Sequence, residues 1–423
     1  MASASGALPV SDALARRALF AALSRLRGGR IEIDESGRRS AFGPAGSELE
    51  ARVEVRDPRA YRWTLRGSTG LGEGYVDGLW STDDLVSLSR IACRNLGPWD
   101  RWRRRLHPLI GPVQRGLDLV PRNTRTGAAQ HISAHYDLGN ELFESFLDRR
   151  LIYSCAYFTE PETSLEQAQV AKLERVCDAL ELGPDDHLLE IGAGWGGLAI
   201  HAATTRGCRV TTTTISREQH AYANERVREA GLGDRVEVLL RDYRDLDGRY
   251  DKLASIEMIE AVGWQYFPAF FKRCAELIRA QGAMFLQAIT IDDELYEAEK
   301  AARSFSNKHI FPGGCLPSLE LITRLGAANG MPIAWADDIS PHYARTLASW
   351  RERFNEAWPV LRQLGYDERF RRLWNFYLAS SEAGFRERRI RDVQMVLAKP
   401  GREKEVGTWS SPTSDMAPAS LSS

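Results

Sequence analysis

The sequence lacks the features that mark several large classes of protein. Its six cysteines contain no C-x-x-C pair, which argues against both a structural zinc site and a framework of disulfides. Reduced thiols instead fit a cytosolic protein. No apolar run approaches the length of about 18 residues that a membrane-spanning helix needs, and no signal-peptide core of convincing length opens the chain. We therefore expect no membrane-spanning segment.

Lysine is absent from the first 130 residues. This stretch contains 21 arginines and 14 acidic residues, a balance of +7, so the remainder carries −8 of the total charge of −1. A basic segment on an acidic body indicates an anionic partner, either nucleic acid or an anionic membrane face. The alternative is a solvated surface with scattered arginines, and charge alone does not separate the two.

The densest basic stretch is WDRWRRRLHPLI, which contains Trp99, Arg101, Trp102, Arg103, Arg104 and Arg105. Indole rings interleaved with arginines are typical of a peripheral segment at a lipid headgroup layer. We interpret these six residues as part of a docking face for an anionic membrane.

Composition and patterning divide the chain into a small first domain and a larger second one. RIEIDESGRRS and ELEARVEVRD alternate like short strands around a turn, LARRALFAALSRLRGG predicts a helix, and GSTGLGEGYVDGLW is rich in turn residues. We expect an α+β domain over residues 1–122, a linker over 123–130 and a second domain over 131–399. The first ten residues and residues 400–423 are rich in Ser, Ala, Pro and Gly and should be disordered.

Beyond residue 130, apolar strand-like segments alternate with helix-like ones. We expect strands in HLLEI, RVTTTTIS, RVEVLLRD, YDKLASIEMI and AMFLQAITI. This alternation predicts an α/β fold, with a parallel sheet covered by helices on both faces. HLLEIGAGWGG runs into a glycine-rich turn with Gly192 and Gly194, where a ligand can approach the backbone at a helix N-terminus. Taken alone the turn is weak evidence, because any tight strand-to-helix turn favours glycine.

A missing carboxylate separates two kinds of nucleotide fold. A nicotinamide dinucleotide site usually has an acidic residue about 20 positions after the glycines, at the end of the second strand. Here that strand ends in Thr211 to Thr214. The turn and the order of the strands instead resemble the fold of the methyltransferases that use S-adenosylmethionine (SAM).

Four separated blocks then resemble one family. They are HYDLGNELFESFLDRRLIYSCAYF, LLEIGAGWGGLAIHAA, SIEMIEAVGWQYFPAFF and HYARTLASW. Together they are similar to the cyclopropane-fatty-acyl-phospholipid synthases and the related mycolic-acid cyclopropane synthases. The GLGEGYVDGLW block also resembles the amino-terminal domain of the phospholipid-acting branch, a domain that the mycolic-acid branch lacks.

The resemblance implies an enzyme that transfers a methylene group from SAM to the cis double bond of unsaturated acyl chains in membrane phospholipids. In the family, a bound bicarbonate ion is the base that removes a proton so that the cyclopropane ring closes. The intermediate cation must be kept from water, and aromatic faces can stabilise it. Two alternatives stay open. Proton loss to an exocyclic methylene would lead to a branched chain, and a catalytically inactive lipid-binding protein would have no reaction at all.

The resemblance also implies roles for residues at matching positions. The bicarbonate site would be formed by Cys155, Glu260, Tyr343, Gln287 and the backbone amide of Ile289. The SAM site would contain Tyr153, Ser154, Gly192, Gly194, Thr214, Gln219, Asp242 and Tyr243. The alternative for Cys155, in LIYSCAYF, is a small buried apolar filler. Gln287 stands where the best-known members have a histidine, and an amide can donate a hydrogen bond but cannot titrate.

Partners and location follow from the resemblance and the charge. We expect an unsaturated phospholipid in an anionic membrane surface as the partner, a peripheral position at the cytoplasmic face of the membrane, and no metal. A homodimer is compatible with the sequence. No nucleic-acid partner is expected, because no aromatic-interleaved RNA-binding motif or N/D-P-P-Y-type motif is present. Candidates for lining an acyl channel, with core packing as the alternative, are Phe305, Phe311 and Leu316.

Overall fold

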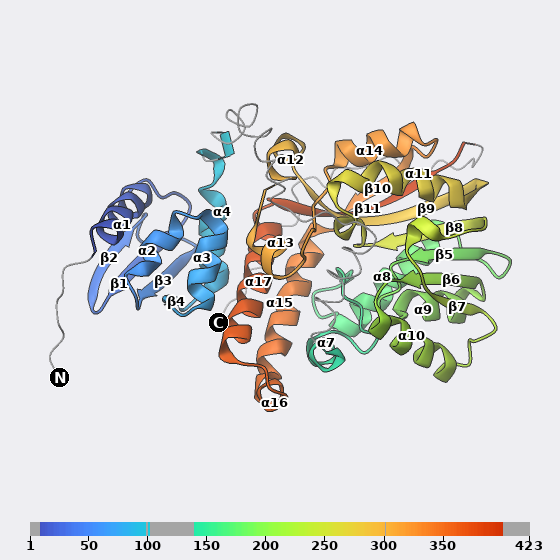
Figure 1. Cartoon of the computed structure of the whole chain (residues 1–423), viewed down its shortest axis with the longest axis horizontal. Coiled ribbons are helices and arrows are strands. Elements are labelled where there is room, and N and C mark those ends of the chain that lie inside the picture. Colours follow the sequence, from blue (N-terminus) through green and yellow to red (C-terminus); the bar gives the residue numbers. More distant parts are fainter. Residues whose placement is uncertain (1–8, 99, 102–138, 301, 401–423) are drawn as a thin grey trace. The chain divides into compact units, whose positions relative to one another are not determined.

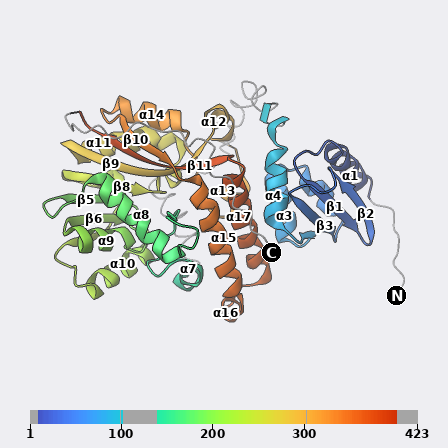
Figure 2. The ribbon, with the colours of Figure 1, turned by 180° about the vertical axis from the view of Figure 1, so that it is seen from behind.

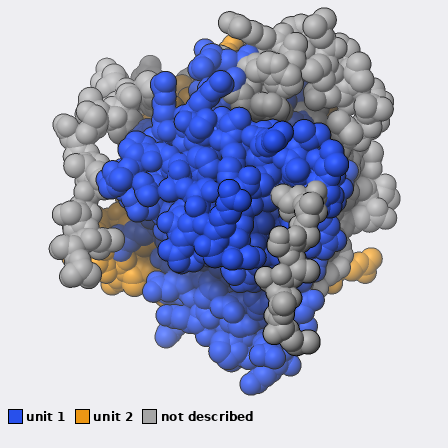
Figure 3. Space-filling model, turned by 90° about the vertical axis from the view of Figure 1, so that its left-hand side faces the viewer, with its two compact units in different colours: residues 1–149, 292–315, 341–390 blue, residues 150–291, 316–340, 391–423 orange. Residues whose placement is uncertain are grey.

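The chain forms two compact units, which Figure 3 colours separately. The structure is a computed structural model that describes residues 9–98, 100–101, 139–300 and 302–400. Unit 1 comprises residues 1–149, 292–315 and 341–390, and unit 2 comprises residues 150–291, 316–340 and 391–423. Two late segments thus share a unit with the N-terminal region. The expected linker, 123–130, and the expected disordered ends, 1–10 and 400–423, lie outside the described residues except for Pro9, Val10 and Pro400, so the domain boundaries stay a prediction.

A four-stranded sheet with the order β2-β1-β3-β4 lies in unit 1. Its strands are β1 (Arg30–Glu35), β2 (Arg38–Phe42), β3 (Glu50–Val55) and β4 (Trp80–Thr82). β1 and β2 form an antiparallel hairpin, and β1 pairs in parallel with β3. Ile31, Ile33 and Ala51 are buried, so alternate residues of β1 and β3 supply the core of the sheet. The strands expected from the alternating pattern are confirmed.

Helices form the rest of unit 1, as Figure 1 shows for its N-terminal part. They are α1 (Val10–Leu23), α2 (Arg59–Thr64), α3 (Gly67–Val76), α4 (Leu85–Arg94), α7 (Asn140–Phe146), α12 (Asp293–Glu299), α13 (Phe305–His309), α15 (Ser340–Glu356), α16 (Trp358–Gln363) and α17 (Glu368–Arg386). The expected helix near the N-terminus is confirmed as α1. The side chain of Asp84 caps α4 by accepting hydrogen bonds from the backbone of Val86 and Ser87.

The glycine-rich stretch GSTGLGEGYV forms helix α3, so its interpretation as a run of turns is wrong. The glycines are explained by packing. A Cβ atom on Gly72 would lie 2.4 Å from the ring of Phe305 and 2.7 Å from that of Phe376, and one on Gly70 would lie 2.1 Å from the carbonyl oxygen of Trp63. Glycine here removes side-chain volume so that neighbouring elements of unit 1 can approach the helix backbone.

Charged side chains also tie α3 to the segment around α13 within unit 1. Glu73 is 7 % exposed, forms an ion pair with Lys308 and lies 3.0 Å from the Nε2 atom of His309. These contacts hold the carboxylate ionised and keep its pKa below the usual value although burial opposes this. Phe305 packs on Phe376 with the ring centroids 4.6 Å apart. In the described structure Phe305 is thus a packed core residue, and its role in an acyl channel stays a prediction.

Unit 2 contains a seven-stranded sheet with the order β10-β11-β9-β8-β5-β6-β7 among the described residues. Its strands are β5 (His187–Ile191), β6 (Arg209–Thr214), β7 (Val236–Leu240), β8 (Tyr250–Ile256), β9 (Ile278–Ile291), β10 (Ile333–Asp338) and β11 (Ile390–Ala398). β5 to β9 are joined by parallel pairing, which confirms the predicted parallel sheet. β10 and β11 form an antiparallel pair that we did not expect.

Helices cover both faces of this sheet, as Figures 1 and 2 show. On one face, α8 (Leu165–Leu180), α9 (Gly197–Arg206) and α10 (Arg217–Glu229) share a buried apolar cluster with the strands. On the other face lie α11 (Phe267–Leu277) and α14 (Leu319–Ala328), which contact β9 and β10 respectively. The α/β class with both faces covered is therefore confirmed.

No helix among the described residues combines the length and the apolar character that crossing a membrane requires. This agrees with the lack of a long apolar run in the sequence.

We expect Gly72→Ala to destabilise the protein. The added methyl group would overlap two aromatic rings, and overpacking of this kind costs about 1–3 kcal/mol. The higher helix propensity of alanine offsets about 1 kcal/mol of that cost. Urea unfolding should therefore show a net loss of up to about 2 kcal/mol. Gly97→Ala is the matched control, because the nearest atom to its Cβ would be 3.7 Å away and no loss is expected. Equal stability of the two variants would contradict the packing explanation.

Candidate functional site

The turn between β5 and α9 has a backbone that favours glycine. Gly192, Gly194 and Gly196 have φ angles of 104°, 51° and 84°. A side chain would be strained at these angles. A Cβ atom on Gly194 would meet no atom within 4 Å, so its backbone faces open space, whereas one on Gly192 would lie 3.0 Å from the side chain of Met258. An open, unhindered backbone at the start of a helix fits the approach of a nucleoside ligand such as SAM.

The end of β6 lies against this turn. The backbone N–H groups of Gly192 and Ala193 both donate to the carbonyl oxygen of Thr213, at 3.0 and 2.9 Å. The buried Thr214 donates from Oγ1 to Oε1 of Gln219 at 2.8 Å. Thr214 at the end of β6 and Gln219 on α10 are therefore brought together, and both are neutral where a dinucleotide site has a carboxylate.

The residues after β7 complete the same edge of the sheet. Asp242 accepts hydrogen bonds from the backbone N–H and the guanidinium of Arg244, so its carboxylate is fixed in position. Tyr243 is 9 % exposed, and its ring packs edge-on against Phe270 with centroids 5.3 Å apart. The ends of adjacent parallel strands meet at one edge, which is where open α/β sheets bind ligands.

The LIYSCAYF stretch is anchored by α8. The backbone oxygen of Ser154 accepts a hydrogen bond from the Gln169 amide at 2.9 Å, and its hydroxyl accepts one from Nζ of Lys172 at 2.6 Å. Lys172 is 1 % exposed, which is rare for lysine. Ser154 thus has a firm position in unit 2, and Tyr153 precedes it. Lys172 was not predicted as a site residue, because in the sequence it is only one polar position in a helical pattern.

Glu190 lies on β5 just before the glycine turn and was also missed. It is 5 % exposed, and its Oε2 atom accepts a hydrogen bond from the Thr212 hydroxyl at 2.5 Å. Burial raises the pKa of this carboxyl group to about 8. Near neutral pH the residue is therefore mainly protonated beneath the glycine turn.

Glu260, predicted as a bicarbonate ligand, lies in η2 (Ile259–Ala261) after β8. Its Oε1 atom accepts the backbone N–H of Ile289 at 2.5 Å, so these two predicted residues meet directly. Its Oε2 atom is enclosed and has no hydrogen-bond partner among the described residues. Burial and the nearby charge of Glu257 raise the pKa of Glu260 to about 8. The protonated group has a donor available for an anion, which fits a site that binds bicarbonate.

Cys155 is fully buried, and Glu257 fixes its backbone. The Cys155 N–H donates to Oε1 of Glu257 at 2.8 Å, and the thiol lies 3.2 Å from the carbonyl oxygen of Ala156. Burial raises the pKa of the thiol well above its usual value, and the charges of Asp392 and Glu257 add to this effect. The thiol therefore stays protonated, so it can donate a hydrogen bond but is poorly suited to act as a nucleophile.

Gln287 donates hydrogen bonds to two carboxyl groups. Its Nε2 atom donates to Oε1 of Glu257 at 2.7 Å and to Oδ2 of Asp392 at 2.9 Å. Its Oε1 atom accepts from Nε2 of Gln394 at 3.0 Å. Both amide hydrogens are thus occupied in the structure. Its role as a bicarbonate ligand stays a prediction, and it would need one of these hydrogens to be released.

Asp392 and Glu257 were missed in the sequence although they lie at the centre of this cluster. Asp392 is fully buried, its Oδ1 atom has no hydrogen-bond partner among the described residues, and burial beside Glu257 raises its pKa well above the usual range. Glu257 has a φ angle of 48°, a strained conformation for a side chain that is typical of functional sites. The signal for Glu257 was its place three residues before Glu260 in SIEMIE, whereas Asp392 had no local signal.

Tyr343 belongs to unit 1, on α15, and is 5 % exposed. Its ring packs at 4.4 Å from that of Phe385 and edge-on against Trp350. Its role beside Cys155 stays a prediction. Trp99, Trp102 and Arg103 to Arg105 of the expected docking face lie outside the described residues, and Arg101 is exposed.

Comparison with known proteins shows the family of the chain. A family model described as mycolic acid cyclopropane synthetase matches residues 123–395. Tuberculostearic acid methyltransferase UfaA1 of Mycobacterium tuberculosis is 40 % identical over 361 residues, which are 82 % of each chain. Cyclopropane-fatty-acyl-phospholipid synthase of Escherichia coli K12 is 35 % identical over 355 residues, 82 % of this chain and 88 % of the relative.

Solved structures agree. Mycolic acid cyclopropane synthase CmaA1, complexed with S-adenosylhomocysteine and CTAB, matches with a TM-score of 0.61 and 31 % identity over 64 % of this chain and 98 % of its own. The cyclopropane synthase MmaA2 of Mycobacterium tuberculosis also has a TM-score of 0.61, with 30 % identity over 67 % of this chain and 100 % of its own. The predicted SAM-methyltransferase fold is thereby confirmed.

We expect Glu190→Gln to change how stability depends on pH. In the folded protein Glu190 keeps its proton up to about pH 8, whereas in the unfolded chain it loses the proton near its ordinary pKa of 4.5. This group therefore makes the free energy of unfolding fall as the pH rises from about 5 to 8, by up to about 1.4 kcal/mol per pH unit. The amide cannot ionise, so urea unfolding between pH 5 and 8 should show a flatter slope.

The exposed Glu237→Gln on β7 controls for the loss of one acidic residue and should keep the wild-type slope. A Glu190→Gln protein with an unchanged slope would show that the carboxyl group is ionised in the folded state.

Proposed function

Because the chain belongs to the mycolic acid cyclopropane synthetase family and is a SAM-dependent methyltransferase that acts on lipids, we propose that its substrates are unsaturated acyl chains of membrane phospholipids. The product would be a cyclopropane acyl chain, with bicarbonate as the base. The observation that carries this proposal is the enclosed Glu260 carboxyl group, with Cys155 and Ile289 in the same unit as the glycine turn.

The reaction needs a proton acceptor that is held in place, and the cluster of Glu260, Cys155 and Ile289 can hold one. SAM supplies a methyl group whose bond to sulfur breaks with both electrons kept by sulfur, while the π electrons of the alkene form the new carbon–carbon bond. The neighbouring alkene carbon is left positive. Loss of a proton from the added methyl group then lets the electrons of that C–H bond close the ring. The proton needs an acceptor that is held in place and kept from bulk water.

The protein's own residues would prepare that acceptor. Glu260, with a pKa of about 8, can donate from its enclosed Oε2 atom to an anion at neutral pH. The protonated thiol of Cys155 offers a second donor. Bicarbonate, when bound, would supply the basic oxygen, and two charge-assisted hydrogen bonds would fix its orientation. Neither residue needs to ionise during the reaction.

The phospholipid substrate is supported by the name of one relative together with the extent of its match. The Escherichia coli relative, named for cyclopropane formation on fatty-acyl phospholipids, aligns over 355 residues, more than the stretch 123–395 covered by the family model. The alignment therefore includes part of the N-terminal region, where the basic segment lies. We accordingly propose an anionic membrane surface as the partner, reached from the cytoplasm.

A second outcome is favoured by two specific observations. The relative with 40 % identity is named a tuberculostearic acid methyltransferase, and Gln287 uses both amide hydrogens within the protein. If a hydrogen moves with its electron pair from the methylated carbon to the cationic one, the positive charge comes to lie on the methylated carbon. Loss of a methyl proton then yields a methylene (=CH₂) branch on the acyl chain. Ring and methylene products have the same mass, so the two outcomes are separated by NMR rather than by mass.

We expect Cys155→Ser to lower turnover and leave SAM affinity close to wild type, because the thiol faces the acid cluster. Purified protein would be incubated with SAM and vesicles of unsaturated phospholipid, and the fatty-acid methyl esters analysed by mass spectrometry and proton NMR. A gain of one CH₂ with cyclopropyl signals supports the ring product, and a gain of one CH₂ with new =CH₂ signals, which the –CH=CH– group of the substrate does not give, supports the methylene. The control is Cys93→Ser in unit 1, which should change neither quantity.

Equal loss of SAM binding and turnover in Cys155→Ser would remove this residue from the base site. If wild-type protein adds no carbon to any unsaturated acyl chain, the proposed function is wrong.

We expect replacement of the basic segment to weaken membrane binding. Arginine attraction to anionic lipid is worth about 1 kcal/mol per residue, so four substitutions should cost roughly two to four kcal/mol in a flotation assay. Salt sensitivity should fall together with binding, and SAM affinity should be unchanged. The residues to be replaced by glutamine are Arg101, Arg103, Arg104 and Arg105.

The matched control replaces four exposed arginines of unit 2 by glutamine: Arg209, Arg228, Arg235 and Arg279. If both quadruple variants lose the same binding energy, net charge and not a docking segment controls the association. If neither loses any, the arginines form an ordinary solvated surface.

A further inference from the structure

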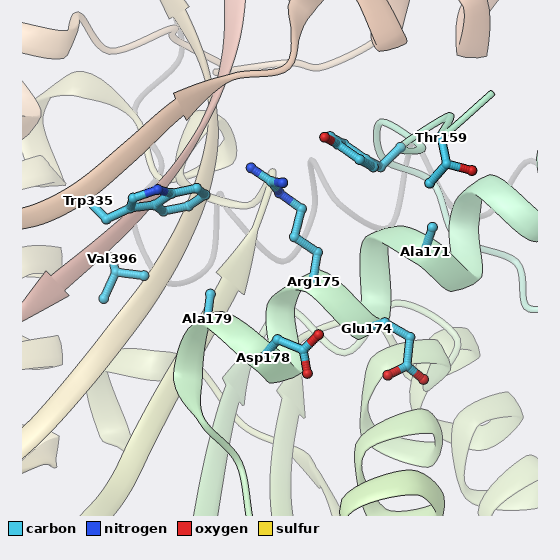
Figure 4. A pocket seen from close by; sticks show the side chains of 9 residues that line it. Thr159, Ala171, Glu174, Arg175, Asp178, Ala179, Trp335 and Val396 are labelled. Atoms are coloured by element: carbon cyan, nitrogen blue, oxygen red, sulfur yellow. The ribbon is translucent and has the colours of Figure 1, made fainter. Parts of the chain in front are cut away.

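A surface pocket of about 520 Å³ in unit 2 contains an arginine with an unusual set of contacts. Figure 4 shows Arg175 extending from α8 toward Trp335 on β10. Its guanidinium lies 5.0 Å from the ring centroid of Trp335 and 4.6 Å from that of Tyr157. It also forms an ion pair with Asp337. The rings and the carboxylate hold the guanidinium in one place.

From this pocket a line of hydrogen bonds runs inward across the sheet. Nε of Arg175 donates to Oε1 of Gln394 at 2.6 Å. Nε2 of Gln394 donates to Oε1 of Gln287 at 3.0 Å, and Nε2 of Gln287 donates to Glu257 and Asp392. Arg175 lies on α8, and the other residues of the line lie on or next to β11, β9 and β8, which are adjacent in the sheet. Both glutamines are fully buried.

The guanidinium chemistry of Arg175 fixes the donor-to-acceptor direction of every hydrogen bond in this line. A guanidinium can donate hydrogen bonds but cannot accept them, whereas a glutamine amide can do both and can be rotated by half a turn. Because Arg175 requires an oxygen, the Gln394 amide must turn its nitrogen inward. Gln287 must then offer its oxygen to Gln394 and both of its hydrogens to the acids.

We propose that Arg175 is a positioning residue for the reaction site, acting through Gln394 to fix the orientation of the Gln287 amide so that it donates to both Glu257 and Asp392. This inference rests on the proposed function in one respect, namely that these acids belong to the reacting site. The hydrogen-bond line itself is independent of the substrate.

The alternative orientation would be unfavourable at the inner end. A Gln287 amide turned by half a turn would place its oxygen against Oε1 of Glu257, so one acceptor would face another. Glu257 would lose a donor, and the same oxygen of Glu257 holds the N–H of Cys155 at 2.8 Å. A change at the surface pocket would thereby disturb the position of the predicted thiol.

Three variants test the direction of the line. Arg175→Met removes every donor but keeps an apolar chain between the rings. Gln394→Glu keeps an acceptor for Arg175, whose guanidinium favours the ionised form of the new carboxyl group, and removes the amide donor to Gln287. Arg175→Lys keeps a donor for Gln394. The control Asp337→Asn removes the ion pair and leaves all residues of the line in place.

The primary measurement is the side-chain amide signal of Gln287 in protein labelled with ¹⁵N-glutamine, assigned by its loss in Gln287→Met. We expect the signal to move in Arg175→Met and Gln394→Glu and to stay in place in Arg175→Lys and Asp337→Asn. Turnover should fall about tenfold in the first two, the size expected for one hydrogen bond lost from a buried network, with SAM affinity unchanged.

An unmoved Gln287 signal in both Arg175→Met and Gln394→Glu would overturn the proposal, whatever happens to turnover. A signal that moves equally in Asp337→Asn would also overturn it, since a general loosening of the pocket would then be responsible. The signal is read without substrate, so it remains informative even if the lipid reaction proposed above is not found.

Discussion

The site depends on three carboxyl groups that lie close together, of which Asp392 is fully buried and Glu257 and Glu260 are half-buried. Glu257, Glu260 and Asp392 are held in unit 2 by neutral donors, namely the Gln287 amide and the backbone N–H groups of Cys155 and Ile289. Burying a carboxylate is costly, and a second charge nearby makes the cost larger. The protein meets this constraint by retaining protons, and the raised pKa values of Glu260 and Asp392 express it. Those retained protons are what allow an acidic cluster to offer hydrogen bonds to an anion.

The order of the strands creates this cluster. β11 lies between β10 and β9, so Asp392 and Gln394 come next to Gln287 although more than 100 positions separate them in the chain. Glu257 follows β8, and its N–H donates to the carbonyl oxygen of Gln287 at 2.9 Å. That bond, together with the positive φ angle of Glu257, turns its side chain toward the same amide. The strain is stabilised by the side-chain hydrogen bonds it makes possible.

The sequence was informative where a pattern is local. Apolar runs bounded by turns predicted β5 to β9, and the glycines of EIGAGWGG predicted a turn that needs positive φ angles. Glu260 contacts Ile289 and Thr214 contacts Gln219, and each pair was assigned to one site from the family blocks, but the roles of these residues stay predictions. α3 was misread because its glycines serve tertiary packing, which a local rule reads as turns. Asp392 and Gln394 could not be found, since their importance comes from an antiparallel strand at the end of the chain.

The replacement of a histidine by Gln287 then has a physical meaning. A histidine can carry a charge and place one N–H on an anion, but it cannot donate two hydrogens from one atom to two acids. Gln287 does this, and it stabilises the pair formed by Glu257 and Asp392 without adding charge. A bound anion would consequently depend more on Glu260 and Cys155. Fewer donors around the base leave its orientation less constrained, and orientation decides which proton it can reach after the methyl group has been added. Under the proposed function, the choice between ring closure and a methylene product would therefore depend on the hydrogen bonds that hold the Gln287 amide to Glu257 and Asp392.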